Sequence, residues 1–204
     1  MEVCRRLHAR DLIGAGEGNV SCRLGPGKLL VTPSGVSKGF IKPADLLIVN
    51  DRGEKLQGRG RPSTELRMHL AVYAARPDVE AVVHAHPITT VALTVAGLGP
   101  PGDLVPEAAV TLGPVALARF AVPGTDEVPA SMAAALPGHD VILLERHGAL
   151  TVGKTLFEAF DRMETLERVA RVAFLARMLG KCEPLSPAVV DRVLVAAGRP
   201  PRAG

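Results

Sequence analysis

Short predicted strands joined by tight turns constrain the fold of this chain more than any other feature. Strands are expected at residues 19–23, 29–32 and 45–50, with PSG, KP and DRG turn signals among them. A parallel pairing of neighbouring strands needs a crossover of about a dozen residues or more, which several of these connections are too short to supply. The sheet is therefore expected to be mainly antiparallel or mixed.

Helical segments interleave with the strands and complete the expected fold. Segment 89–96 fits either a helix or a strand by its periodicity. We find no repeat, low-complexity tract or interdomain linker in the 204 residues. The expected fold is a single layered α/β domain spanning residues 1–204, with a central sheet flanked by helices. Helices are predicted at residues 2–13, 63–75 and 155–179 and from residues 125 and 186 onward, and further strands at 80–86, 115–121 and 140–145.

Composition argues against several classes of protein. A content of 47% hydrophobic and 22% charged residues is typical of a soluble globular protein. The net charge of +3, the scattered arginines and the single tyrosine disfavour a nucleic-acid surface. The start MEVCRRLHARD does not fit a signal peptide, and we see no apolar run of membrane-spanning length. Three distant cysteines outside any CxxC pair predict no disulfide framework, so the expected location is the reducing cytoplasm.

The motif VVHAHP predicts a metal site. Alternate residues of a strand share one face, so His84 and His86 should lie side by side. His147 ends another apolar strand, directly before Gly148, where a strand passes into a loop. Catalytic zinc often has three protein ligands and one open position, which three histidines would fit. The other histidines, His8, His69 and His139, stand alone in the sequence and are interpreted as structural or surface residues.

The segment PSTE begins the helix predicted at residues 63–75. Glu65 could be no more than a carboxylate favoured by the helix dipole. The same helix start, however, offers free backbone N–H groups and the hydroxyls of Ser63 and Thr64, which could bind a phosphate. Two further pairs of small polar loop residues that could approach an anion closely are Gly18-Asn19 and Ser34-Gly35.

Taken in order, the motifs GNVS, TPSG, PSTE, VVHAHP and RHG resemble the class II aldolase/adducin-like family over nearly the whole chain. Within that family the likeness is greatest to the L-fuculose-1-phosphate aldolases. The resemblance implies one Zn²⁺ per subunit on His84, His86 and His147, and a catalytic carboxylate at Glu65. It also implies a homotetramer with active sites between subunits. The substrate phosphate would be bound by Gly18, Asn19, Ser34, Gly35, Ser63 and Thr64.

The reaction implied is the reversible cleavage of a ketose 1-phosphate into dihydroxyacetone phosphate and an aldehyde. The glutamate at position 65 favours an aldolase over the 4-epimerases of the family, in which an aspartate is expected. Alternatives are a dehydratase of the methylthioribulose-1-phosphate type and a non-catalytic interaction domain such as the adducin head. The three histidines together with Glu65 disfavour the adducin-like alternative, which lacks the zinc histidines.

Two departures from the family pattern bear on the mechanism. The fuculose-phosphate aldolases have a tyrosine acid/base in the loop after the HxH strand, whereas Tyr73, in the preceding helix, is the single tyrosine here. The loop offers Asp103, Glu107 and Thr111 in its place. Glu17 stands before Gly18 where a small or hydroxyl residue is usual. The second acid/base group and the role of Glu17 therefore stay open at this point.

Overall fold

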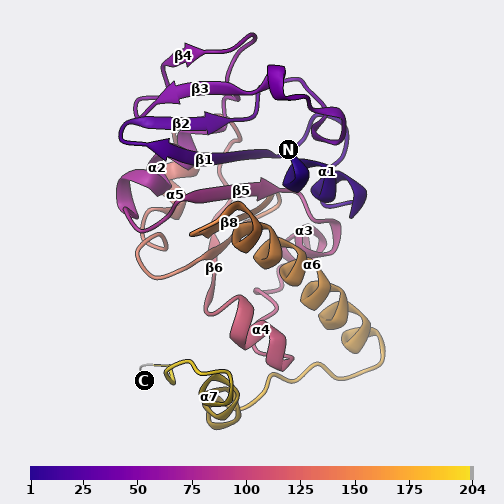
Figure 1. Ribbon diagram of the computed structural model, residues 1–204. Coiled ribbons are helices and arrows are strands. Elements are labelled where there is room, and N and C mark those ends of the chain that lie inside the picture. The colour runs from indigo at the N-terminus through magenta and orange to yellow at the C-terminus, as the bar shows by residue number, and fades with distance from the viewer. Residues whose placement is uncertain (203–204) are drawn as a thin grey trace.

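A single eight-stranded sheet dominates the computed structural model, which describes residues 1–202 (Figure 1). The strand order is β4-β3-β2-β1-β5-β8-β7-β6. Strands β6 and β7 pair in parallel, and the other neighbours pair antiparallel, which confirms the predicted mixed sheet. The strands are β1 (Asn19–Gly25), β2 (Lys28–Val31), β3 (Leu47–Asn50), β4 (Lys55–Gln57), β5 (Ala81–Ala85), β6 (Val115–Ala118), β7 (Val141–Leu144) and β8 (Gly148–Gly153).

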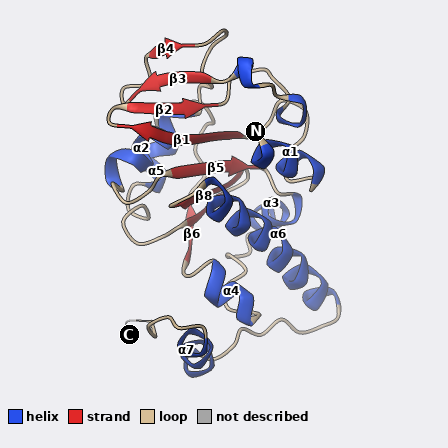
Figure 2. Cartoon of the chain, in the orientation of Figure 1, coloured by secondary structure: helices blue, strands red, loops and turns tan. Residues whose placement is uncertain are grey.

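Helices cover both faces of the sheet (Figure 2). One apolar core joins α1, α4 and α6 to one face, and a second joins α2 and α5 to the other. Helix α6 extends well beyond the sheet (Figure 1), and α4 packs against both α6 and α7. The helices are α1 (Glu2–Ala9), α2 (Leu66–Ala75), α3 (Ile88–Val95), α4 (Pro106–Thr111), α5 (Glu127–Met132), α6 (Leu156–Met178) and α7 (Pro187–Ala196), with 3₁₀ turns at Lys38–Phe40 and Pro43–Asp45.

Strand β5 lies at the centre of the sheet and carries the site. All five of its residues are buried, because both faces of the strand are covered by helices. Alternation places Val83 in the core with α1 and α6, whereas Val82 belongs to the core with α2 and α5. His84 shares the face of Val82, and this puts its imidazole on the side of α2.

The structure corrects several predicted elements. Strand β8 was not predicted, although it lies between β5 and β7, because glycines bound it and it follows directly on a turn. The ambiguous segment 89–96 is a helix, α3. Helix α1 ends at Ala9 and not at residue 13, since Asp11 takes a positive φ of 57°. Helix α2 begins at Leu66, so that Ser63 and Thr64 lie in the turn before it.

Other boundaries differ by a few residues, and two short elements, β4 and α4, were missed. The edge strand β4 has three exposed residues and so lacks an apolar pattern. The long helix begins as predicted, with Thr155 Oγ1 accepting the Glu158 N–H at the start of α6. Across residues 1–202, none of the helices is both long enough and apolar enough to cross a membrane.

Candidate metal centre

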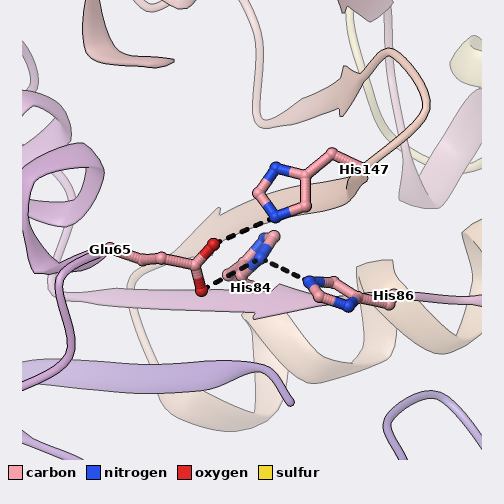
Figure 3. A group of neighbouring side chains, drawn as sticks. All are labelled: Glu65, His84, His86 and His147. Atoms are coloured by element: carbon pink, nitrogen blue, oxygen red, sulfur yellow. Dashed lines mark hydrogen bonds and ion pairs between the residues drawn. The ribbon is translucent and has the colours of Figure 1, made fainter. Parts of the chain in front are cut away.

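Glu65, His84, His86 and His147 converge on one point (Figure 3). One potential ligand atom from each lies within 4.8 Å of those of the other three. The Nε2 atoms of His84 and His86 are 2.9 Å apart, and His147 Nε2 is 3.0 Å from Glu65 Oε1. Glu65 Oε2 is 3.6 Å from His84 Nε2. The four residues that were singled out in the sequence therefore form one cluster.

The backbone around this cluster explains why the RHG motif ends in glycine. His147 follows strand β7 in a tight turn, in which its N–H donates to the Leu144 carbonyl and Arg146 has a φ of 58°. A Cβ at Gly148 would collide with the Ala85 carbonyl oxygen and lie 2.8 Å from His86 Cδ2. Only glycine lets this turn approach the end of β5 so closely.

Groups outside the cluster orient two of the imidazoles. His84 Nδ1 lies 3.0 Å from the Ala149 carbonyl oxygen, so it carries the proton and leaves Nε2 as the lone-pair donor. His86 Nδ1 lies 3.6 Å from Glu17 Oε1, on the open side of the cluster. A carboxylate or carbonyl behind a ligating histidine is the usual arrangement in metal sites. Both Nε2 atoms therefore face the centre of the cluster.

Burial sets the charge of the donor set. Burial lowers the pKa of His84 well below its usual range, and it lowers the pKa of His86 as well. Burial acts to raise the pKa of Glu65, but the hydrogen bond with His147 and the nearby imidazoles outweigh it and lower the pKa to about 2. At neutral pH these groups are two neutral imidazoles and one ionised carboxylate. These are the protonation states that a bound cation requires.

Gly18 and Asn19 contribute to the cluster from the end of the glycine-rich loop. Gly18 has a φ of 66°, and a Cβ there would lie 2.9 Å from the His84 carbonyl oxygen. The Asn19 side chain is buried and donates from Nδ2 to Glu65 Oε2 at 2.7 Å. The amide of Asn19 therefore holds the carboxylate of Glu65.

The other phosphate candidates lie in two neighbouring loops. Pro33 and Pro62 form a β-bridge, and the Ser34 N–H donates to the Arg61 carbonyl. These contacts bring Ser34-Gly35 beside Ser63-Thr64. Ser63 Oγ accepts the Glu65 N–H at 3.2 Å, and it lines a small cavity that Asn19 also lines.

An open cavity of about 690 Å³ adjoins the histidines. His86 and His147 are among its lining residues, and helix α3 provides an apolar side. Asp11 and Glu17 add carboxylates. The cavity is large enough for a sugar phosphate, since ligand pockets commonly have volumes of about 300 to 1,000 Å³.

Sequence reasoning missed two residues near the cluster. His69 had been interpreted as isolated, but it is buried and contacts Asn19. Its spacing of four residues from Glu65, close to one helical turn, was the available signal. Glu167, on α6, accepts the backbone N–H groups of Thr89 and Thr90 and so fixes the start of α3 directly after His86. Nothing in the sequence pattern links it to a segment 77 residues away.

Other residues that were considered lie apart from the centre. Tyr73 is buried, and its hydroxyl bonds to Ser21. Asp103 pairs with Arg202, and neither Asp103 nor Glu107 is among the described residues that line the cavity. His8 packs edge-on against Phe40, and His139 bonds to the Ala135 carbonyl, in agreement with structural roles.

Comparison with known proteins gives consistent results. Residues 1–174 match the sequence model of the class II aldolase and adducin N-terminal domain. The chain is 32% identical to an L-fuculose phosphate aldolase of Methanococcus maripaludis (88% of this chain, 96% of that protein). It is 31% identical to a 5-methylthioribulose-1-phosphate/5-deoxyribulose-1-phosphate aldolase of Rhodospirillum rubrum (95% and 87%). It is 35% identical to a 3-oxo-tetronate 4-phosphate decarboxylase of Escherichia coli K12 (85% and 83%).

The fold agrees as well. The solved structure of L-fuculose-1-phosphate aldolase from Thermus thermophilus is 36% identical and superposes with a TM-score of 0.78, covering 91% of this chain and 95% of that one. The class is metal-dependent, and the Glu65 and histidine cluster is where this chain could hold the ion. The chain therefore belongs to the class II aldolase and adducin N-terminal domain family and is an enzyme of the class II aldolase type.

Proposed function

We propose that this chain is a zinc-dependent aldolase that reversibly cleaves a ketose 1-phosphate, of the L-fuculose-1-phosphate kind, into dihydroxyacetone phosphate and an aldehyde. The observation that carries the proposal is the convergence of Glu65 with three imidazole Nε2 atoms beside an open cavity. Retention of this whole donor set also argues against the adducin-like alternative of a non-catalytic interaction domain.

Zinc is the metal proposed for the cluster. Three histidine nitrogens and an adjacent carboxylate suit Zn²⁺, which accepts both ligand types at about 2 Å. In the proposal His84, His86 and His147 hold the ion, and Glu65 stands next to it. A bound cation would supply the positive charge that stabilises the negative charge developing on substrate oxygens as the carbon–carbon bond breaks.

Glu65 is proposed to move the proton. When the bond breaks, the electron pair stays on the carbon next to the carbonyl, and that carbon must then be protonated. Glu65 Oε2 is held by Asn19, which gives the carboxylate a fixed orientation at the edge of the cluster, with Oε1 toward His147. General acid–base transfer from such a position typically contributes about 10² to 10⁴ in rate. Water in the open cavity is the proposed acceptor of the proton on the hydroxyl that becomes the aldehyde.

The substrate phosphate is proposed to bind at the two neighbouring loops. The β-bridge between Pro33 and Pro62 supports this role, because it brings the segments that contain Ser34 and Ser63 close together. Small residues and free backbone N–H groups are the usual means of binding a phosphate. The full proposed set is Gly18, Asn19, Ser34, Gly35, Ser63 and Thr64.

The three relatives support a phosphorylated substrate with a carbonyl group. Their names describe two aldolases and a decarboxylase, and both reactions leave an electron pair on a carbon beside a carbonyl. One buried arrangement of cation and base could serve either reaction. The aldehyde product would then depend on the cavity, and we favour the ketose 1-phosphate because of the L-fuculose phosphate aldolase relatives.

We also propose a homotetramer with sites between subunits and a cytoplasmic location. Large apolar side chains are exposed toward the end of α6, including Met178 (72%) and Leu179 (89%), and a neighbouring subunit would cover them. Free Cys4, Cys22 and Cys182 suit a reducing compartment. Light scattering that finds a monomer at working concentration would contradict the tetramer.

The experiment that tests the proposed function is an assay with two phosphorylated ketoses and one phosphorylated keto acid. The zinc-loaded protein is incubated with L-fuculose 1-phosphate, 5-methylthioribulose 1-phosphate and 3-oxo-tetronate 4-phosphate. We expect dihydroxyacetone phosphate from the first at the greatest kcat/KM. Release of CO₂ from the third substrate with no cleavage of the others would replace the aldolase by a decarboxylase. Loss of water from the second substrate would indicate the dehydratase alternative.

A further inference from the structure

A buried line of side chains runs from Tyr73 to the carboxylate of Glu65. Tyr73 Oη is 2.8 Å from Ser21 Oγ, which is 2.7 Å from His69 Nδ1. His69 Nε2 is 2.5 Å from Asn19 Oδ1, and Asn19 Nδ2 is 2.7 Å from Glu65 Oε2. Ser21 and Asn19 come from β1, whereas the other three come from α2 and the turn before it. The line therefore connects two elements that are far apart in sequence.

The carboxylate at the end of this line fixes every proton in it. An ionised Glu65 can only accept, so Asn19 must present Nδ2 to it and Oδ1 to His69. His69 must then donate from Nε2. Burial lowers the pKa of His69 to about 4, so its ring is neutral at pH 7 and Nδ1 has to accept from Ser21. The Ser21 oxygen in turn accepts the hydroxyl proton of Tyr73, and all four donors point toward Glu65.

This direction of the hydrogen bonds makes the N–H of His69 important for the orientation of the Asn19 amide. An asparagine amide can turn over and exchange its oxygen and nitrogen. A turned amide of Asn19 would oppose its oxygen to the Glu65 carboxylate, so that hydrogen bond would be lost. Its N–H₂ would also meet the N–H of His69, unless the hydrogen bonds of His69, Ser21 and Tyr73 all reversed. Because His69 is 1% exposed, water cannot readily substitute for its N–H.

We propose that His69 is a positioning residue that holds the Glu65 carboxylate in its working orientation by locking the amide of Asn19. The inference rests on the proposed proton transfer by Glu65. Within a buried network each hydrogen bond polarises the next, so the line also places the positive ends of four dipoles toward the carboxylate. A reacting group that is displaced by about 1 Å can lose on the order of 10² in rate.

The test compares two substitutions of His69 in the zinc-loaded full chain. His69→Leu removes both ring nitrogens, and His69→Gln keeps an N–H₂ that can reach Asn19. With L-fuculose 1-phosphate we expect the leucine variant to lose about 10- to 100-fold in kcat, with KM and zinc content unchanged, because groups behind an active site typically have effects of that size. The glutamine variant should recover most of the loss. A leucine variant with wild-type kcat, or one in which KM alone rises, would overturn the proposal.

A double-mutant cycle with Asn19→Ala separates positioning from general stabilisation. If His69 acts through Asn19, His69→Leu should have little further effect on kcat in the Asn19→Ala background. Additive losses would show that His69 does not act through this amide. Should the leucine variant fail to fold, His69→Asn, which reaches toward Ser21 but not toward Asn19, replaces it. Equal activity of the asparagine and glutamine variants would then also overturn the proposal.

The same measurements distinguish failure of this inference from failure of the proposed function. A wild-type chain without cleavage of L-fuculose 1-phosphate, and without proton exchange on dihydroxyacetone phosphate, refutes the aldolase itself. If the wild-type chain is active and the His69 variants have the same kcat as wild type, the role of His69 is refuted and the aldolase stays in place.

Discussion

The two sides of the metal centre differ in burial and in bonding. The buried wall consists of Asn19, Glu65, His69 and His84, and hydrogen bonds join Asn19 to both Glu65 and His69 while His84 bonds to the Ala149 carbonyl. The open wall consists of Glu17, His86 and helix α3, and it faces the cavity of about 690 Å³. His84 is fully buried, whereas the Glu17 side chain is 47% exposed.

This difference separates two tasks. Proton transfer needs fixed geometry, and we propose that the buried wall supplies it through hydrogen bonds that are largely shielded from water. We propose that the choice of substrate depends on the open wall, where Ile88 and Val95 of α3 are 62% and 49% exposed. Relatives about equally similar to this chain are named for different reactions, and we expect the differences between them to concentrate on the open wall.

The largest expected effect is loss of the metal, and it should occur on both walls. His84→Ala and His86→Ala should each lose zinc and activity, because both remove a ligand. The two variants should differ in how much stability the folded protein loses. His84→Ala also removes the buried hydrogen bond to the Ala149 carbonyl, at a cost of about 0.5 to 1.5 kcal/mol, whereas His86→Ala should cost less. Zinc analysis together with thermal unfolding of the metal-free proteins checks this, and equal losses of stability would break the comparison.

Glu65→Gln should retain zinc and the fold but lose about 10² to 10⁴ in kcat, since the amide keeps the shape of the side chain and removes the base. Steady-state cleavage of L-fuculose 1-phosphate measures the loss. The matched control is Glu127→Gln, at the start of α5 and exposed, which should leave kcat unchanged. Near-normal turnover of the Glu65 variant would reduce Glu65 to a carboxylate at a helix start.

The buried wall should also make the metal-free protein sensitive to acid. Burial lowers the pKa of His69 from 6.5 to about 4 in the folded state. At a pH between these two pKa values, His69 is protonated in the unfolded chain but not in the folded chain. The free energy of unfolding therefore rises from about pH 4 to pH 6.5 and levels off at higher pH. His69 contributes up to about 3 kcal/mol to this rise. Urea unfolding at pH 5 and pH 7 should show a smaller difference for His69→Gln than for wild type, and an identical difference would contradict the assignment.

The smallest effect is expected on the open wall. Glu17→Gln weakens the electrostatic support of His86 Nδ1. Because Glu17 Oε1 lies 3.6 Å from this nitrogen and the Glu17 side chain is about half exposed, we expect about a tenfold loss of zinc affinity. Chelator competition measures it. Asp11→Asn is the control, because Asp11 also lines the cavity. If both variants bind zinc like wild type, Glu17 has no role in holding His86.

The sequence predicted that His84 and His86 lie side by side, because the HxH spacing in a strand is a local pattern that strand alternation carries into space. Glu65 and His147 were grouped with them through the family resemblance, and the structure brings all four together. The same reasoning predicted a mixed sheet but missed β8, whose flanking glycines resemble a loop. His69 was missed because its partner Asn19 lies 50 residues away, and only the packing of α2 on β1 brings them together. The phosphate loops remain proposals, since small polar residues are equally common in ordinary turns.

Isotope exchange on one half of the reaction tests the central claim most directly. The zinc-loaded enzyme is incubated with dihydroxyacetone phosphate in deuterated water without any aldehyde, and the phosphate ester is followed by NMR spectroscopy. The account predicts that wild type exchanges one carbon-bound proton for deuterium and that Glu65→Gln abolishes the exchange. Exchange that persists in Glu65→Gln, or a wild type that exchanges nothing yet eliminates water from a ketose 1-phosphate, would contradict it.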